Sequence, residues 1–365
     1  MLQKSMQKSL MIWEVFNAMN VILFFDSTLR DGSHAVKHQI SKEQITAYCK
    51  QADDAGLYTV IVGHGNGLGA SSLQVGLSAL SDEEMLTTAR QELNKTKLGA
   101  FLIPGFGTIK DNLSPAIDIG VDVVCIGSHC TEADVTKQHI EYVRGRGKEA
   151  YGVLMMYHMT SKEKLLEEAR KMQTYGALGV ILMDSAGTST PNMVTETVKY
   201  LCDNTDVKIG FHAHNNLSLA VVNSYLAIQA GAEIIDGTIR GFGAGAGNCQ
   251  LEVLIGLLHK MEINTKVDLY RLMDISENII SAMMLIPQGI SSLSLISGIA
   301  GVFSAFASHV SEAAERFGVD PRDIFLELGR RGIIGGQEDH IVDVAMYLSQ
   351  KKAAGEFSYQ IESLL

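Results

Sequence analysis

The amino-acid sequence predicts an α/β protein built as a closed (β/α)8 barrel with a C-terminal helical extension. Between Val21 and Met261, short apolar runs recur about every 25 to 40 residues. Charged stretches with a helical pattern separate the runs, and polar or glycine residues follow them. Apolar runs that alternate with helices indicate a parallel sheet covered on both faces, and a count of eight favours a closed barrel over an open doubly wound sheet.

The expected strands are, in chain order, Val21–Phe25, Thr59–Val62, Leu98–Ile103, Asp122–Ile126, Tyr151–Met156, Gly179–Met183, Lys208–His212 and Glu233–Thr238. Helical patterns lie between them. The pattern Ser41–Ala55 opens with a serine and has Gln44 three residues later, which predicts a capping box. The pattern Ser161–Tyr175 also opens with a serine.

The length of 365 residues fits one large domain and a smaller one. We expect an N-terminal extension over residues 1–20, the barrel over 21–275 and a C-terminal helical domain over 276–365. With 46% hydrophobic and 19% charged residues, the chain has enough apolar surface for a folded core and too little charge for disorder.

The charge and the cysteines exclude further classes of protein. The net charge is −11, and no cluster of lysine or arginine rises above it, which argues against nucleic acid as a partner. The five cysteines are odd in number and never spaced C-x-x-C, so neither a disulfide framework nor a zinc ribbon fits. This pattern predicts a cytoplasmic protein.

Two segments raise the question of a membrane. In the segment from Met1 to Asn20, Glu14 interrupts a short apolar run and no cleavage site follows, so we expect an added segment rather than a secretory signal. The segment from Asn278 to Ser311 contains no Asp, Glu, Lys or Arg, but Pro287, glycines and serines break it up. This favours buried helices or an apolar subunit contact over a membrane span.

Candidate catalytic residues follow the strands, because the carboxyl ends of barrel strands meet at one face. His212 and His214 are two apart at the end of the seventh run, so both side chains can reach one metal ion. Asp31, after the first run, adds a carboxylate, and Asn248 in the glycine-rich loop after the eighth run could add a weaker oxygen. These ligands suit Mn²⁺ or Mg²⁺ and would accept Co²⁺, Fe²⁺ or Zn²⁺. Polar packing inside the barrel is the alternative for the histidine pair.

Three further polar residues have a catalytic and a structural interpretation. Arg30 is adjacent to Asp31, so we expect the two side chains to point differently; Arg30 would stabilise a substrate carboxylate or enolate, or form an ion pair elsewhere. His34 would act as an acid or base, or be an exposed loop histidine. Ser185 and nearby backbone amides would bind a carboxylate, or Ser185 would cap a turn.

Several motifs, in chain order, carry a resemblance to known enzymes. The run from Phe25 to Ala35 resembles the signature that opens the metal-dependent aldolases and lyases related to hydroxymethylglutaryl-CoA lyase. More narrowly, the chain is similar to the 4-hydroxy-2-oxovalerate aldolase family from about Val21 to Leu348. The motifs behind this narrower resemblance are His34-Ala35-Val36-Lys37-His38-Gln39, His64-Gly65-Asn66-Gly67-Leu68, His129-Cys130-Thr131-Glu132-Ala133-Asp134, Leu154-Met155-Met156-Tyr157-His158-Met159 and Gly243-Ala244-Gly245-Ala246-Gly247-Asn248.

The resemblance implies a barrel whose C-terminal extension docks an acylating aldehyde dehydrogenase and channels the aldehyde product to it. It implies Asp31, His212 and His214 as ligands of Mn²⁺, with Mg²⁺ and Co²⁺ as alternatives, Arg30 as the residue that stabilises the enolate, and His34 as the catalytic histidine. It also implies a place in aromatic hydrocarbon catabolism, and we expect a homo-oligomer.

Three positions depart from the family pattern. A tyrosine of the family's C-terminal region reaches the aldehyde end of the active site, and Ile299, which has no hydroxyl, aligns with it here. The family's His-Gly-Asp-Gly is His64-Gly65-Asn66-Gly67, and Asn215 replaces a second histidine after the His-x-His pair. Pyruvate-enolate chemistry keeps all of its parts, so we expect these departures to affect the size and stereochemistry of the aldehyde.

The predicted reaction is the retro-aldol cleavage of a 4-hydroxy-2-oxo acid, and its reverse. A divalent metal would polarise the 2-oxo acid, His34 would take the proton of the 4-hydroxyl, and Arg30 would stabilise the pyruvate enolate. No lysine that could form a Schiff base ends a predicted strand.

Four rival functions remain open at this point. A Claisen-type synthase that joins an acyl-CoA to a 2-oxo acid would use the same metal and arginine. The run Gly65-Asn66-Gly67-Leu68-Gly69-Ala70 matches the G-x-G-x-x-A pattern of dinucleotide oxidoreductases, although no clear ribose-binding acid follows the next run. The other two are a barrel retained as a non-catalytic partner subunit and an iron oxygenase with two histidines and one carboxylate.

Overall fold

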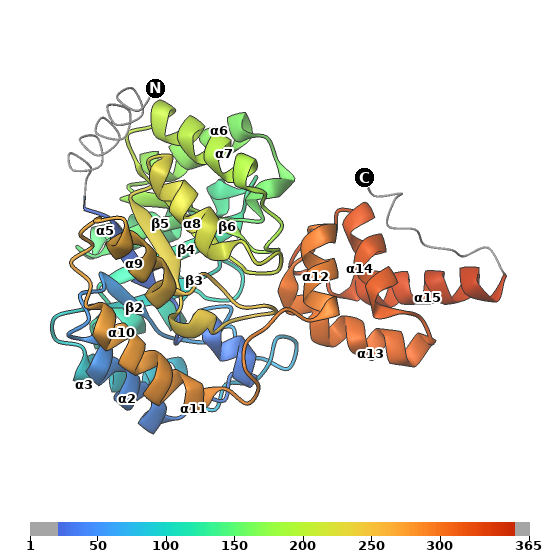
Figure 1. Ribbon diagram of the computed structural model, residues 1–365, viewed down its shortest axis with the longest axis horizontal. Helices are drawn as coiled ribbons and strands as arrows, with labels where there is room; N and C mark the ends of the chain where they lie inside the picture. The colour runs from blue at the N-terminus through green and yellow to red at the C-terminus, as the bar shows by residue number, and fades with distance from the viewer. Residues whose placement is uncertain (1–20, 355–365) are drawn as a thin grey trace.

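The computed structural model of the protein describes residues 21–354, and it shows a closed barrel of eight parallel strands in chain order (Figure 1). The strands are β1 (Leu23–Asp26), β2 (Thr59–Ile61), β3 (Lys97–Leu102), β4 (Val123–His129), β5 (Glu149–Met155), β6 (Gly179–Asp184), β7 (Lys208–Ala213) and β8 (Ile234–Gly237). β8 pairs with β1, with Phe25 opposite Asp236, and this pairing closes the barrel. The predicted (β/α)8 barrel is therefore confirmed.

All eight predicted strands are present, and only their ends differ. β1 begins at Leu23 rather than Val21, whose side chain is 59% exposed. β4 continues three residues further than expected, because its pairing with β5 runs on to His129 opposite Met155. Each strand ends where its pairing with a neighbouring strand ends. The sequence pattern of a single strand carries no information about that pairing.

Helices lie on the outside of the barrel; those up to Gln229 connect successive strands, and those from Leu251 onward follow the last strand. They are α2 (Lys42–Ala52), α3 (Asp82–Glu92), α4 (Ser114–Ile119), α5 (Lys137–Gly145), α6 (Lys162–Thr174), α7 (Pro191–Asn204), α8 (Ala220–Gln229), α9 (Leu251–Lys260), α10 (Leu269–Ile275) and the short α11 (Ser281–Met283). Ser41 caps α2 in the predicted capping box with Gln44, and Ser161 caps α6. The loop that contains Gly65 and Gly67 leads to α3 only at Asp82, so these glycines do not open a helix as a dinucleotide fingerprint would.

Side chains alternate along the strands between two apolar layers. Phe24 packs outward with the surrounding helices, whereas Phe25 points into the barrel interior with Ile61 and Ile181. The helical layer includes Ile280 and Met283, so residues after the predicted boundary at 275 pack with the barrel. The division of the chain at that residue stays a prediction, and the predicted N-terminal extension lies outside the described residues.

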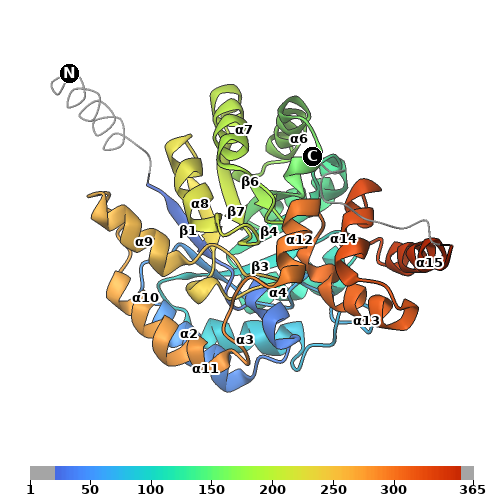
Figure 2. The same ribbon diagram turned by 45° about the vertical axis from the view of Figure 1, so that its right-hand side comes forward.

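Four C-terminal helices form a second unit with its own core (Figure 2). They are α12 (Ser292–Ala300), α13 (Ala307–Phe317), α14 (Pro321–Arg330) and α15 (Asp339–Ala353). This unit is joined to the carboxyl ends of the barrel strands by hydrogen bonds from loop residues. The Nδ2 atom of Asn216 donates to the carbonyl of Ser294 over 2.8 Å, and Nε2 of His158 lies 3.1 Å from the carbonyl of Gly301.

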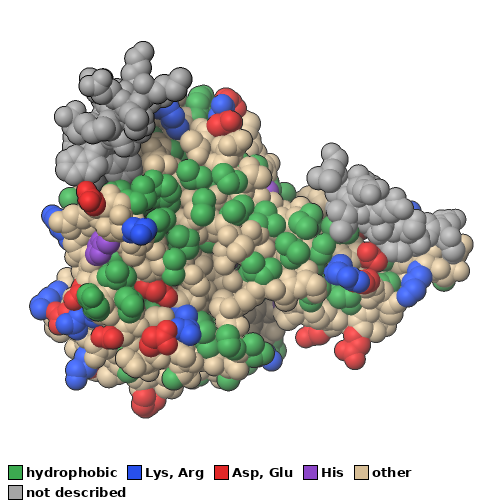
Figure 3. All heavy atoms as spheres, viewed as in Figure 1, with side chains coloured by type: hydrophobic (Ala, Val, Ile, Leu, Met, Phe, Trp, Pro, Cys, Tyr) green, Lys and Arg blue, Asp and Glu red, His purple; other side chains and the backbone are tan. Residues whose placement is uncertain are grey.

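The uncharged segment from Asn278 to Ser311 crosses from the barrel to this second unit. No helix among residues 21–354 combines the length and the apolar character needed to cross a bilayer. The segment is only partly buried, because the side chains of Leu285 and Ile286 between the two units are 79% and 80% exposed. Figure 3 shows hydrophobic side chains on the exposed surface of both units.

Candidate active site and metal centre

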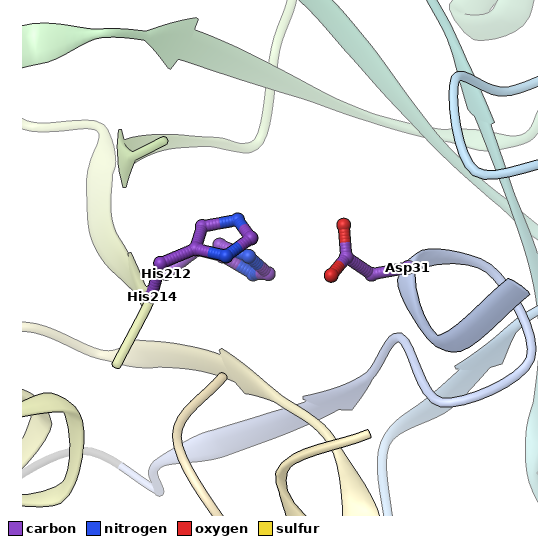
Figure 4. Close-up of side chains that lie close together, drawn as sticks. All are labelled: Asp31, His212 and His214. Carbon is purple, nitrogen blue, oxygen red and sulfur yellow. The ribbon is translucent and has the colours of Figure 1, made fainter. Parts of the chain in front are cut away.

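Asp31, His212 and His214 meet at the mouth of the barrel. One ligand atom from each residue lies within 4.8 Å of the others, and all three side chains are buried. The two histidines come from the end of β7 and point toward Asp31, which begins the short helix η1 (Asp31–Val36) after β1 (Figure 4). The sequence predicted these three residues as a metal-ligand set, and the tertiary structure brings their ligand atoms together.

The hydrogen bonds around this cluster leave atoms available for a metal ion. Nδ1 of His212 lies 2.8 Å from Oδ2 of Asp236, whereas Nε2 of His212 is buried without a partner among the described residues. Nδ1 of His214 and Oδ1 of Asn248 are likewise buried and unpaired in the described part of the chain. Because an unpaired buried polar atom costs free energy, these atoms fit an ion held by two imidazoles, a carboxylate and an amide oxygen.

The electrostatics also suit a cation. Burial, opposed in part by Asp31, lowers the pKa of His214 to about 4, so this imidazole is neutral at neutral pH. Burial alone would raise the pKa of Asp31, but Arg30 and the neighbouring histidines hold that pKa well below its usual range. Neutral imidazoles and an ionised carboxylate are the protonation states that bind a metal ion.

Arg30 lies against the cluster rather than away from it. Its Nη1 donates to Oδ1 of Asp31 over 2.8 Å, so the expectation that these two neighbours point differently is wrong. The backbone turns into η1 at Arg30, and both side chains therefore enter the barrel mouth. Nη2 donates to the hydroxyl of Ser27 over 3.3 Å, and Nε is buried without a partner among the described residues. This N–H therefore has no hydrogen-bond acceptor among the described residues.

His34 projects from η1 near the same cluster and is only partly buried. Burial lowers the pKa of His34, partly offset by the charge of Asp31, so the ring is neutral at neutral pH. A neutral, partly accessible imidazole beside a guanidinium can accept a proton from a bound substrate.

The remaining predicted residues have different surroundings. Ser185, directly after β6, is buried and its Oγ accepts from the backbone N–H of Met156 over 3.2 Å. Ile299 lies on α12 with 42% of its surface exposed. The backbone N–H of Asn66 donates to Nδ1 of His64 over 3.0 Å, so this position shapes the loop after β2. The predicted substrate contacts of Ser185 and Ile299 stay predictions.

Asp236 is a site residue that the sequence analysis missed. It accepts from the hydroxyl of Ser27 over 2.8 Å and bonds Nδ1 of His212, so it fixes the orientation of that ring. The signal was present: Asp236 is two residues after Ile234, which faces the barrel interior, and alternation along β8 points this acid inward as well.

Replacing Asp236 by asparagine should weaken Mn²⁺ binding roughly 10- to 100-fold. The asparagine would accept from Ser27 and donate its amide N–H to Nδ1 of His212, which moves the ring proton onto Nε2. The dissociation constant of Mn²⁺, measured by electron paramagnetic resonance at fixed pH, tests this. Unchanged Mn²⁺ affinity in Asp236→Asn would show that Nε2 of His212 does not bind the ion.

Comparison with known proteins places this barrel in a class. The HMGL-like family matches residues 21–279, and a DmpG-like communication domain matches residues 288–350. The chain therefore belongs to the HMGL-like class of barrel proteins.

Relatives with about half of their residues identical identify the family within this class. The chain is 52% identical over 330 residues to a 4-hydroxy-2-oxovalerate aldolase of Pectobacterium atrosepticum, covering 90% of this chain and 96% of that protein. It is 54% identical over 333 residues to one of Serratia proteamaculans, covering 91% and 99%. The chain is a member of the 4-hydroxy-2-oxovalerate aldolase family, whose members are carbon–carbon lyases.

Solved structures agree with the fold. The N-terminal domain of a putative aldolase from Bacteroides vulgatus matches with a TM-score of 0.67 at 25% identity, over 78% of this chain and 94% of that one. The carboxyl transferase domain of Rhizobium etli pyruvate carboxylase, in a variant crystallised with pyruvate, matches with a TM-score of 0.76 at 16% identity, over 93% and 62%. At that identity the second likeness concerns the fold alone.

Proposed function

We propose that the protein is a divalent-metal-dependent aldolase that cleaves a 4-hydroxy-2-oxo acid into pyruvate and an aldehyde, and catalyses the reverse addition. The observation that carries this proposal is the convergence of Asp31, His212 and His214 with Arg30 and His34 at one barrel mouth. The chain's identity of about one half to 4-hydroxy-2-oxovalerate aldolases supports it. This similarity favours an aldolase over a Claisen-type synthase and over a non-catalytic subunit.

Asp31, His212 and His214 would hold the metal, with Oδ1 of Asn248 as a further oxygen ligand. When bound there, a divalent ion supplies a Lewis acid for the oxygens of a 2-oxo acid. The mixed nitrogen and oxygen ligands suit Mn²⁺, with Mg²⁺ and Co²⁺ as alternatives.

Arg30 would stabilise the negative charge that develops on the substrate, and His34 would accept its proton. The unpaired Nε–H of Arg30 donates to the oxygen on which charge develops as pyruvate enolate forms. His34 accepts the proton of the 4-hydroxyl group as the C3–C4 bond breaks, so the aldehyde leaves and the electron pair of that bond stays on pyruvate enolate. A proton then adds to C3 of the enolate and gives pyruvate. The backbone amides near Ser185 would bind the substrate carboxylate.

The decisive experiment is exchange of the C3 protons of pyruvate for deuterium in D₂O with added Mn²⁺. An aldolase that forms the enolate should exchange these protons and then condense pyruvate with aldehydes in a screen of acceptors. Absence of exchange in a protein that binds Mn²⁺ would contradict the proposal, and turnover of an acyl-CoA instead would identify a Claisen-type synthase.

The match of residues 288–350 to a communication domain supports association with an acylating aldehyde dehydrogenase that takes the aldehyde product. Copurification of the two proteins tests this association. The cytoplasmic location, the homo-oligomeric state and a role in aromatic hydrocarbon catabolism stay predictions.

Replacing Ile299 by tyrosine should shift acceptor preference toward short aldehydes. Isoleucine offers a branched apolar wall without a hydrogen-bond donor, so a pocket that it lines selects by shape. The ratio of kcat/KM between acetaldehyde and a longer aldehyde should change, with Mn²⁺ affinity and pyruvate exchange nearly unaltered. An identical acceptor profile and identical C4 stereochemistry in both proteins would show that Ile299 does not line the aldehyde pocket.

A further inference from the structure

Three histidines from two loops pack in a row beside the candidate active site. The ring centroids of His34 and His38 lie 4.9 Å apart in an edge-to-face arrangement. The rings of His38 and His64 are stacked, with their centroids 3.7 Å apart and their planes at 19°. His34 belongs to the proposed chemistry, whereas His38 and His64 have no part in it.

His38 is held from several sides. Its side chain is buried, and Nδ1 lies 2.8 Å from the hydroxyl of Ser33 and 3.4 Å from the backbone N–H of Gly65. Its backbone has a φ of 61°, in the left-handed region that histidine seldom adopts. A strained backbone persists where the surrounding contacts fix it, and here those contacts hold the ring between the loops after β1 and β2.

Burial also keeps the two supporting rings uncharged. It lowers the pKa of His38 to about 3 and that of His64 to about 4, in each case mainly by desolvation. The neighbouring His34 and His64 rings, which oppose protonation of His38, and the carboxylate of Asp31, which favours it, are smaller influences on this pKa. Neutral rings can stack closely without repelling each other.

Gly65 connects this stack to both catalytic residues. A Cβ atom at Gly65 would lie 2.3 Å from Nε2 of His34, so the ring of His34 rests directly on the glycine backbone. The carbonyl of Gly65 accepts from Nη1 of Arg30 over 3.3 Å. The N–H of the same residue faces His38.

We propose that His38 is a positioning residue, which holds the ring of His34 in its reactive orientation through edge-to-face contact and through Gly65. This role of His38 depends on the proposed aldolase function only where it is tested by the rate of aldol cleavage. His64 supports the other face of His38, and its Nε2 lies 3.1 Å from the carbonyl of Gly76.

The variant His38→Asn tests the role of the ring. Asparagine tolerates the left-handed backbone and can place its side-chain oxygen where Nδ1 of His38 accepts, but it has no ring to contact His34. We expect kcat for aldol cleavage to fall roughly 10- to 100-fold, as for a misplaced catalytic group, with Mn²⁺ affinity unchanged and pyruvate C3 exchange lowered no more than in His34→Ala. Cleavage at the wild-type rate would overturn the proposal.

A double-mutant cycle separates positioning from a general structural effect. If His38 acts through His34, then His38→Asn should cause no further loss of cleavage in a His34→Ala background. Losses that multiply would show that His38 acts independently of His34, and would overturn the proposal.

The variant Gly65→Ala tests the contact of the His34 ring with the backbone of Gly65. The backbone of Gly65 is outside the left-handed region, so the added methyl group acts by displacing His34, and cleavage should fall as in His38→Asn. The matched control is Gly145→Ala on α5, where a Cβ atom meets nothing within 4 Å. Full cleavage in Gly65→Ala would contradict the contact on which the proposal depends.

The imidazole NMR signals of His34 provide a test that needs no substrate. These signals can be assigned by their loss in His34→Ala of the full chain. They should shift or broaden in His38→Asn, while those of His259 on α9 stay unchanged. Unchanged His34 signals in His38→Asn would overturn the positioning role of His38. If the His34 signals shift but the protein has no aldolase activity, the positioning role is supported and only the proposed reaction is contradicted.

Discussion

Replacing Arg30 by alanine should lower both aldol cleavage and pyruvate proton exchange by 10²- to 10³-fold or more, on the order expected for a lost oxyanion-stabilising donor. Both reactions pass through pyruvate enolate, which Arg30 is proposed to stabilise. Hydrogen bonds to Asp31 and Ser27 fix the guanidinium of Arg30 beside the candidate metal site, and its Nε–H is unpaired among the described residues. Initial rates of cleavage and of deuterium incorporation, measured on one preparation, test this.

His34→Ala is the matched comparison, because it removes a proton acceptor from the same loop and leaves Arg30 in place. Cleavage should fall by something like 10²- to 10⁴-fold, as for a lost general base, and exchange should fall less than in Arg30→Ala. Normal proton exchange by Arg30→Ala would require a different role for this arginine.

Asp31→Asn, His212→Ala and His214→Ala should each abolish activation by divalent metal ions while the barrel remains folded. The three side chains lie at the barrel mouth and do not belong to the apolar clusters that hold strands and helices together. Stoichiometric Mn²⁺ binding, pyruvate exchange and far-ultraviolet circular dichroism should be measured together.

A histidine at the same end of the barrel provides the control. His129 ends β4 and contacts Thr131 through Nδ1, outside the three-residue cluster. His129→Ala should therefore bind Mn²⁺ as the unaltered protein does. Full activity of His212→Ala after removal of metal would refute the assignment of the metal ligands.

The strands were predictable because each carries a local signal. A run such as Gly179–Met183 is apolar throughout, is followed directly by the polar residues Asp184 and Ser185, and is too short for a helix, so it predicts a buried strand without knowledge of its neighbours. The capping box of Ser41 and Gln44 is equally local, and the structure contains it. The end of β4 at His129 was not predictable, because it depends on pairing with Met155 of another strand.

The candidate metal ligands were predictable for a different reason. His212 and His214 share a face by the two-residue period of a strand, and barrel topology brings the loop with Asp31 to the same end. Asp236 could have been found by the same alternation, since it lies two residues after an inward-facing isoleucine. The direction of Arg30 toward Asp31 depended on the turn into η1, and adjacency in the sequence predicted it wrongly.

The sequence by itself determined the barrel, its eight strands, the three candidate metal ligands and the family, because these depend on local periodicity and on motifs of fixed spacing. Only the tertiary structure decided that His38, His64 and Gly65 surround His34, and that Asn216 reaches the C-terminal helices. Such contacts join loops far apart in the chain, and their distances depend on how the barrel closes and on backbone angles such as the positive φ of His38, which no periodicity encodes.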